Sequence, residues 1–213
     1  KNTVIRDKNG NPSVMVIIPK FKLEDIDSSL GTGTHPAFIV HGKEVPEIYY
    51  PKFQNIVVGG CGISQPGVDP TTSITFDQAR AYAQAKGPGW HLSSNAEWAA
   101  IALWSWKNGT MPRGNNNLGC DIDAPYEHGR ETTQGQNRTA RVATGSGPAS
   151  WYHDGTPFGV ADMNGNVWEW QDGMRTVGGY IWVVGEDGTP MNNFDTQNTK
   201  GNNTGWIDTG LCY

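Results

Sequence analysis

The sequence predicts an α+β protein, because the period of its apolar residues changes twice along the chain. Short alternating and β-branched segments, typical of strands, fill the first 58 residues. Two helical patterns follow between residues 75 and 108, and a strand pattern returns at Tyr180–Val184. We therefore expect a β-rich N-terminal module over residues 1–58 and a second domain over residues 59–213, in which two helices pack against a short antiparallel sheet.

The N-terminal module begins with a turn and a clearly marked strand. Asp7–Pro12 is rich in turn-forming residues, and Ser13–Phe21 is a mainly apolar run with a proline near its end. Gly59–Thr72 is predicted as a loop, because Gly-Gly, Pro-Gly and Asp-Pro pairs interrupt it. Further short strands are expected at Ala37–Val40, Glu47–Tyr50 and Phe53–Val58.

Both predicted helices carry a start signal. The first has Thr75 as its N-cap and ends before a Gly-Pro-Gly run. The second opens with Ser94 and Glu97 at the spacing of a capping box, and its apolar residues continue toward Asn108. A short strand at Trp90–Leu92 is expected between them. From residue 111 to 150 the chain is rich in turns, and this length indicates either a functional or a well-packed excursion.

The composition excludes several classes of protein. Of the 213 residues, 28 are Gly and 13 are Pro, which rules out a coiled coil or a simple helical bundle. The net charge of -5 and the lack of a basic run make nucleic acid a poor partner. No apolar stretch approaches the roughly 20 residues of a membrane span, so membrane insertion is not expected.

Aromatic residues are the most informative part of the composition. Nine Trp residues are many for a chain of this length, and large rings set among Asn, Thr and Gly supply contact area at little entropic cost. Aromatic residues among Asn, Thr and Gly occur in the chain after residue 180, which indicates a ligand-binding surface. The alternative is that these are polar loops around buried aromatic residues. The candidate ligand-binding residues are Trp182, Asn192, Asn193, Phe194 and Trp206.

Familiar catalytic motifs are missing from the sequence. The five His residues stand apart without an HExxH pattern, and the Gly-rich runs contain neither GxGxxG nor a P-loop lysine. Cys61, Cys120 and Cys212 form an odd set without CxxC spacing, which favours buried free thiols over a zinc site or a disulfide framework. In an oxidising compartment, one pair of them would still be able to bridge.

Two motifs carry a resemblance to a known family. Gly159–Trp170 contains the run Asn-Gly-Asn-Val-Trp-Glu-Trp, and Trp90–Trp98 leads a short strand into a helix that opens with Glu and Trp. In this order they resemble the formylglycine-generating-enzyme and sulfatase-modifying-factor superfamily, over roughly residues 72–182. The resemblance implies a C-type-lectin-like fold for residues 59–213.

The resemblance also implies a structural calcium ion. In the formylglycine-generating members this motif holds calcium through a side-chain oxygen, two main-chain carbonyls and a glutamate, roles that map onto Asp162, Gly165, Val167 and Glu169. The alternative is that the carboxylates of Asp162 and Glu169 accept hydrogen bonds from main-chain amides and hold the turn without a metal.

With or without calcium, Asp162–Glu169 is expected to form a tight polar segment, which we call the hub. The residues Asn164–Asn166 allow a sharp turn, so that carboxylates at either end converge. Trp168 and Trp170 alternate with Glu169, which predicts both rings buried on one side and the carboxylate on the other.

The oxidase activity of the superfamily is not expected here. Those members hold copper between two cysteines late in the domain, whereas only Cys212 lies late in this chain. No catalytic residue is therefore assigned. Relatives usually continue into terminal strands, so a chain that stops at Leu211–Tyr213 is expected either to be truncated or to complete its sheet with another segment.

A narrower resemblance indicates a function. Asn11–Phe21, Ala96–Trp106 and Gly145–Trp151 are similar to proteins of bacteriophages and prophages in this superfamily, some of them ligand-binding proteins diversified by retroelements. We expect a non-catalytic receptor-binding protein or adhesin, in a phage tail or on a bacterial surface, whose partner is a host-surface protein or glycan. The N-terminal module would then serve assembly, including formation of a homo-oligomer. A copper-dependent oxidase and a purely structural virion protein are the alternatives.

Overall fold

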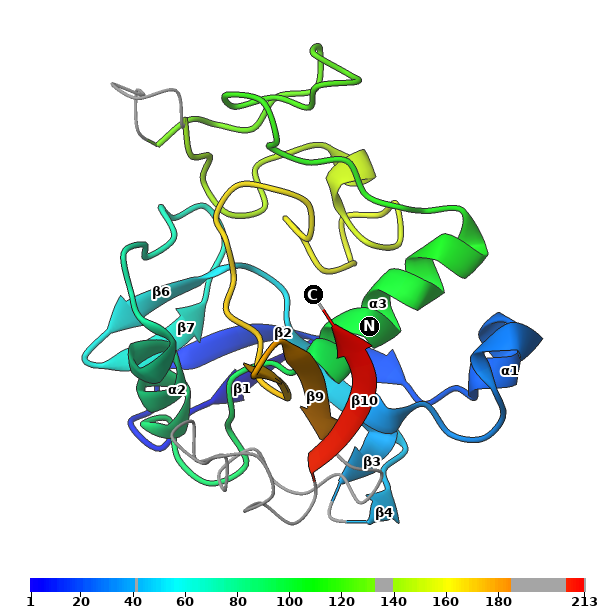
Figure 1. The fold of residues 1–213 in the computed structure, drawn as a ribbon. Coiled ribbons are helices and arrows are strands. Elements are labelled where there is room, and N and C mark those ends of the chain that lie inside the picture. The colour runs from blue at the N-terminus through cyan, green and yellow to red at the C-terminus, as the bar shows by residue number, and fades with distance from the viewer. Residues whose placement is uncertain (41, 133–139, 185–205, 213) are drawn as a thin grey trace. The chain divides into compact units, whose positions relative to one another are not determined.

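The computed structural model describes residues 1–40, 42–132, 140–184 and 206–212, and Figure 1 labels most of their helices and strands. The chain forms two compact units, each built from segments that are separate in the sequence. Residue 58, where the sequence predicts a boundary between modules, lies inside unit 1. Unit 1 comprises Lys1–Ile18, Tyr49–Trp90 and Ile101–Trp170, and unit 2 comprises Pro19–Ile48, His91–Ala100 and Gln171–Tyr213.

A three-stranded sheet begins with the antiparallel hairpin of β1 (Asn2–Arg6) and β2 (Pro12–Pro19), to which β5 (Glu47–Pro51) is added beside β2. The hairpin turn is the one predicted, and the Asp7 carboxylate stabilises it by accepting two backbone N–H groups at 2.8 and 2.9 Å. The buried apolar residues of this region include Met15, Val16, Tyr50 and Phe53.

A second antiparallel hairpin joins β6 (Asn55–Val58), within the strand predicted at Phe53–Val58, to β7 (Cys61–Ser64), which lies where the sequence predicted a loop. Gly59 and Gly60 make its two-residue turn with φ angles of +56° and +78°, which glycine adopts without strain. All residues of β7 are buried. The loop prediction was wrong here, because a Gly-Gly pair closes a hairpin when a second strand is available to pair.

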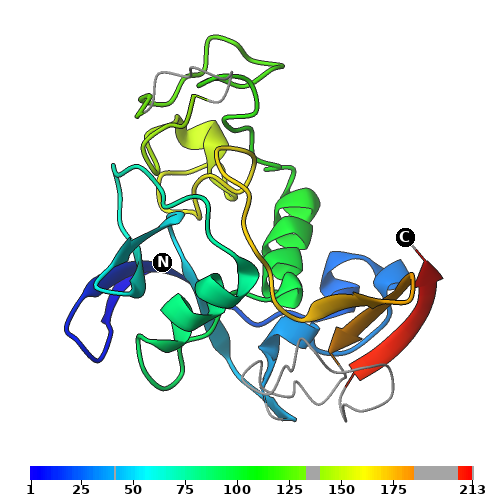
Figure 2. The ribbon, with the colours of Figure 1, turned by 60° about the vertical axis from the view of Figure 1, so that its left-hand side comes forward.

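The helix α2 (Phe76–Gln84) lies beside β7 in unit 1 (Figure 2). Thr75 caps it as predicted, because Thr75 Oγ1 accepts the N–H of Gln78 at 3.2 Å. The Gln78 side chain in turn accepts the N–H of Thr75 at 2.8 Å. Two backbone N–H groups at the helix start are thereby paired.

The helix α3 (Asn95–Asn108) opens with the predicted capping box, in which Ser94 Oγ accepts the N–H of Glu97 at 3.1 Å and the Glu97 carboxylate accepts the N–H of Ser94 at 2.8 Å. The strand predicted at Trp90–Leu92 is absent. After these residues the backbone turns directly into the helix, and Ser94 forms a parallel bridge with Asp172. No helix in the described parts of the chain is long and apolar enough to cross a bilayer.

Unit 2 contains short elements around a cluster of rings. Phe21, His35 and Phe38 pack together with ring centroids 5.2 to 6.2 Å apart. The strand predicted at Ala37–Val40 begins two residues late, because Pro36 starts a 3-10 turn there. The elements of this part are α1 (Leu23–Ile26), 3-10 turns at Ser28–Leu30 and Pro36–Phe38, β3 (Ile39–Val40) and β4 (Lys43–Glu44).

An antiparallel sheet with the strand order β10–β9–β8 belongs to the same unit. The central strand β9 spans Tyr180–Val184, as predicted from the sequence, and it pairs with β8 (Met174–Val177) and β10 (Trp206–Cys212). Short helices and separate antiparallel sheets together confirm the α+β class.

Candidate functional site

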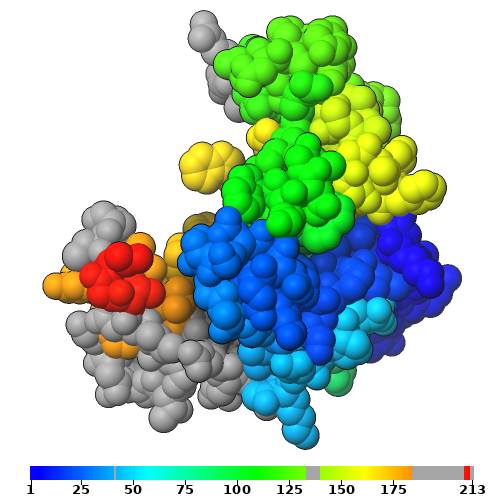
Figure 3. All heavy atoms as spheres, turned by 90° about the vertical axis from the view of Figure 1, so that its right-hand side faces the viewer, coloured from blue at the N-terminus to red at the C-terminus, as the bar shows by residue number. Residues whose placement is uncertain are grey.

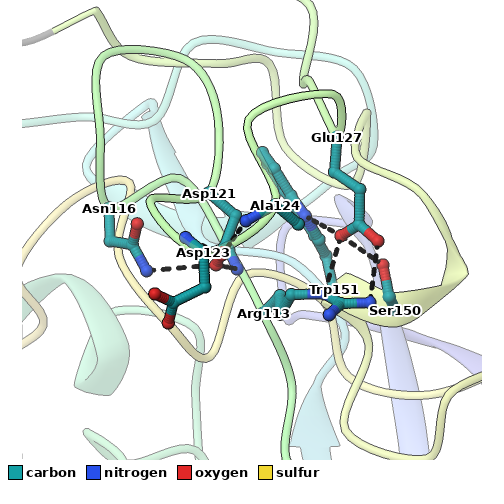
Figure 4. A network of polar contacts seen from close by, with 9 residues as sticks. Arg113, Asn116, Asp121, Asp123, Ala124, Glu127, Ser150 and Trp151 are labelled. Carbon is teal, nitrogen blue, oxygen red and sulfur yellow. Dashed lines mark hydrogen bonds and ion pairs between the residues drawn. The ribbon is translucent and has the colours of Figure 1, made fainter.

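The excursion that follows α3 is organised by two carboxylates, of which Asp121 is the first (Figure 4). It accepts four hydrogen bonds, from the N–H groups of Gly114, Asp123 and Ala124 and from the side-chain amide of Asn116, at 2.9 to 3.1 Å. Burial disfavours the charged form, but these donors outweigh burial and hold the pKa of Asp121 below its ordinary value. The carboxylate therefore fixes the backbone around it.

Glu127 is the second carboxylate (Figure 4). Its Oε2 accepts from Arg113 Nε at 3.1 Å, from Ser150 Oγ at 2.7 Å and from Trp151 Nε1 at 3.1 Å. Trp151 is fully buried at the end of the 3-10 turn Ala149–Trp151. Glu127 thus ties the excursion, green in Figure 3, to the yellow segment that precedes the hub.

Large apolar side chains are exposed on the loop of residues 118–126, which we call the 118–126 loop. Leu118, Ile122 and Tyr126 are 49%, 62% and 77% exposed. Because Asp121 fixes the backbone between them, these side chains are presented to solvent on an ordered loop. The sequence interpretation missed this surface, although apolar residues four apart within a run of turn residues were a signal for it.

The hub bends sharply, because three of its residues have a left-handed backbone. Asp162, Gly165 and Asn166 have φ angles of +58°, +82° and +63°. The turn predicted at Asn164–Asn166 is therefore present. A Cβ atom on Gly165 would collide with the carbonyl oxygen of Asn115, with which the hub forms a parallel bridge. Glycine is required at this position for both reasons.

The four residues predicted as metal ligands meet around the side chain of Gln54, but Asp162 presents its main-chain carbonyl there, whereas its carboxylate accepts the N–H of Gly145. Gln54 Nε2 donates to the carbonyl oxygens of Asp162 and Gly165 at 3.3 Å and of Val167 at 3.2 Å. The Glu169 carboxyl also hydrogen-bonds the Gln54 side chain. Gln54 itself is only 4% exposed. The sequence interpretation missed Gln54, because it stands 108 residues before Asp162.

The two acids of the hub have raised pKa values. Burial raises the pKa of Asp162 to about 6, against a hydrogen bond at 2.7 Å from the N–H of Gly145, which lowers it. Burial and the nearby Asp162 raise the pKa of Glu169 to about 7, against the hydrogen bond with Gln54. The carboxyl of Glu169 is enclosed in this way, although the residue as a whole is exposed.

The two indoles of the hub region are not buried, and that prediction was wrong. Trp168 is fully exposed and Trp170 is about half exposed. Trp170 Nε1 donates to the carbonyl oxygen of Ile74 at 3.1 Å, and its ring packs edge-on against Phe76. Side chains alternate along an extended segment, so turning Glu169 toward the hub turns both rings outward.

The predicted ligand-binding residues are described only in part. Trp182 lies in β9, is 7% exposed, and has its ring centroid 5.4 Å from the Arg175 guanidinium. Asn192, Asn193 and Phe194 lie outside the described residues. The backbone of Trp206 belongs to β10, and its side chain lies outside the described residues. A binding role for these residues stays a prediction.

Each of the two described thiols takes part in a hydrogen bond. Cys61 is 1% exposed, and its sulfur accepts from Asn9 Nδ2 at 3.4 Å. Cys120 Sγ donates to the carbonyl oxygen of Asn117 at 2.9 Å, and both cysteines are free. The side chain of Cys212 is not among those described. Within the described residues, no three His, Cys, Asp or Glu side chains are grouped closely enough to hold a metal ion.

Comparison with known proteins identifies the family. Residues 9–207 match the model of the sulfatase-modifying factor enzyme 1-like domain, FGE-sulfatase. This match extends over most of the chain, so the protein belongs to the FGE-sulfatase family, as its two motifs indicated. A Bos taurus protein named inactive C-alpha-formylglycine-generating enzyme 2 is 27% identical over 142 residues, which are 61% of this chain and 44% of the bovine protein. The match thus spans less than half of that relative.

Proposed function

We propose that this chain is a non-catalytic, ligand-binding member of the FGE-sulfatase family, carried on a phage tail or a bacterial surface. The observation that carries the proposal is the 118–126 loop, where Leu118, Ile122 and Tyr126 are exposed above a backbone fixed by Asp121. Binding surfaces use ordered apolar and aromatic anchors of this kind, because little conformational entropy is lost on contact.

The thiols support binding over oxidase chemistry. A soft copper ion is held by paired thiolates, but Cys61 lies buried in β7 and Cys120 is bonded within the excursion. Both precede the hub in sequence, unlike the late pair of the oxidases. The bovine relative is named inactive, which is consistent with a family that includes non-catalytic members.

The exposed side chains favour a protein as the host-surface ligand. Tyr126 combines a ring with a hydroxyl group, a residue type enriched at the energetic centres of protein interfaces. Leu118 and Ile122 offer a sugar neither a flat ring nor a hydrogen bond, whereas a protein surface can bury them. A glycan ligand is the competing outcome of the test.

Binding to host cells and to a glycan array tests this proposal. The parent should bind cells, and a Leu118→Ser, Ile122→Ser, Tyr126→Ser variant should lose roughly 30-fold or more in affinity. Trp106→Ser is the matched control, because Trp106 is 55% exposed on α3, outside the loop. Equal binding by the triple variant and the parent would place the ligand elsewhere.

Two further measurements complete this test. Alanine variants of Asn192, Asn193, Phe194 and Trp206 examine the C-terminal site in the same binding assay. Copper titration with a thiol-containing peptide examines catalysis, and turnover of the peptide thiol would contradict the non-catalytic role. Binding to the glycan array alone would assign a glycan as the ligand.

A further inference from the structure

The hydrogen bonds of the hub allow only one orientation of the Gln54 carboxamide. The backbone N–H of Val142 can only donate, and it meets Asn166 Oδ1 at 2.9 Å. Asn166 Nδ2 is therefore the donor in the contact with Gln54 Oε1, at 2.9 Å. Since Gln54 Oε1 is the acceptor there, Gln54 Nε2 must face the carbonyl oxygens of the hub.

That nitrogen lies at the point on which the oxygens of the hub converge. Three carbonyl oxygens stand 3.2 to 3.3 Å from it, and the Glu169 carboxyl bonds the same side chain. Calcium takes about six to eight oxygen ligands at about 2.3 to 2.6 Å. The oxygens have the right chemistry for calcium, but the amide nitrogen fills the position that the ion would need. With Gln54 in place, these residues do not fit a bound ion.

We propose that the Gln54 side chain takes the place of the calcium ion implied for this motif, so that the hub closes without a metal. The two N–H bonds of the amide are shared among the carbonyl oxygens of the hub and point their partial positive charge at them. Because the amide belongs to the chain, closure of the hub does not depend on the calcium concentration of the surroundings.

The position of Gln54 is held by the sheet rather than by the hub alone. The residue follows Phe53, whose N–H donates to Ser64 Oγ at 3.0 Å, and Ser64 Oγ donates to the carbonyl oxygen of Val14 at 2.8 Å. Displacing the amide to admit an ion would also break its hydrogen bond with Asn166 Nδ2. This inference does not rest on the proposed ligand-binding function.

Calcium titration of the parent protein tests the inference. The protein is first treated with a chelator, and its thermal unfolding and heat of binding are then measured with and without calcium chloride. We expect the same melting temperature in both conditions and no saturable binding. A stoichiometric isotherm that Glu169→Gln abolishes, or a melting temperature that calcium raises by several degrees, would overturn the inference.

A Gln54→Glu variant replaces the amide nitrogen with an oxygen. We expect it to melt below the parent in chelator, and to gain about 5 to 10 °C with calcium at about 100 times its Kd. Gln84→Glu, on an exposed part of α2, makes the same charge change and should show neither effect. A Gln54→Glu variant that melts like the parent in chelator would also overturn the inference. If this variant does not fold, the titration of the parent decides.

Discussion

Asp121 and Asp162 are both buried in unit 1, with 1% and 2% of their surfaces exposed, yet their pKa values move in opposite directions. Asp121 accepts four hydrogen bonds, and its pKa is lowered. Asp162 accepts one from the N–H of Gly145, and its pKa is raised to about 6. Both carboxylates are shielded from solvent, but Asp162 is packed more deeply and has fewer donors, so burial prevails at Asp162 and hydrogen bonding prevails at Asp121. The excursion is ordered around a charged carboxylate, whereas the hub is closed by the neutral amide of Gln54.

The largest expected effect comes from breaking the turn of the hub. Gly165→Ala should lower the free energy of unfolding by about 3 kcal/mol. Alanine is strained in the left-handed backbone conformation of this position, and its Cβ atom would collide with the carbonyl oxygen of Asn115. Gly60→Ala is the control, since Gly60 also has a positive φ but faces open space, and it should cost about 1 kcal/mol. Urea unfolding at neutral pH measures both. Equal losses would mean that the collision is relieved.

Replacing each acid with its amide sharpens the comparison directly. Asp121→Asn should lower the free energy of unfolding by about 2 kcal/mol, because an amide has one acceptor oxygen for donors that now use two. Asp162→Asn should lower the free energy of unfolding by less than about 1 kcal/mol, because one acceptor oxygen suffices for the N–H of Gly145. Urea unfolding of the two variants checks the difference, and a larger loss for Asp162→Asn would reverse the comparison.

Acidification should remove the stabilisation that the charged Asp121 carboxylate gives the folded protein. Its pKa is lower in the folded protein than the ordinary 3.8, so its charged form stabilises the fold above that pH. The contribution is lost as the pH falls through the folded value. We therefore expect the stability difference between the parent and Asp121→Asn to shrink below pH 3.8. A difference that stays constant in acid would show that Asp121 is not titrating as the structure implies.

The smallest expected effect is on the surface that Asp121 supports. Ile122→Ser and Tyr126→Ser should each change the free energy of unfolding by less than about 0.5 kcal/mol, because both side chains are already in solvent. The measurement is urea unfolding of each single variant beside Asp121→Asn. A loss above 1 kcal/mol would mean that these side chains pack within the fold and do not form a free binding surface.

Local signals predicted the elements that depend on local contacts. Thr75 and Ser94 begin their helices as expected, because a capping box joins residues only three positions apart. The strand at Tyr180–Val184 and the turn at Asn164–Asn166 were also visible in the sequence. For the candidate site, the sequence indicated the four residues that meet in the hub, but not the side chain that lies among them.

By itself, the sequence determined the α+β class, the helix starts and the bend of the hub, because each depends on neighbouring residues or on a backbone that glycine tolerates. The tertiary structure decided that Gly59–Gly60 closes a hairpin and that Trp168 faces outward. It also decided that Gln54 enters the hub, 108 residues away from Asp162 along the chain. No local pattern specifies a pairing at that separation, because it depends on which carbonyl groups still need a donor when the segments meet.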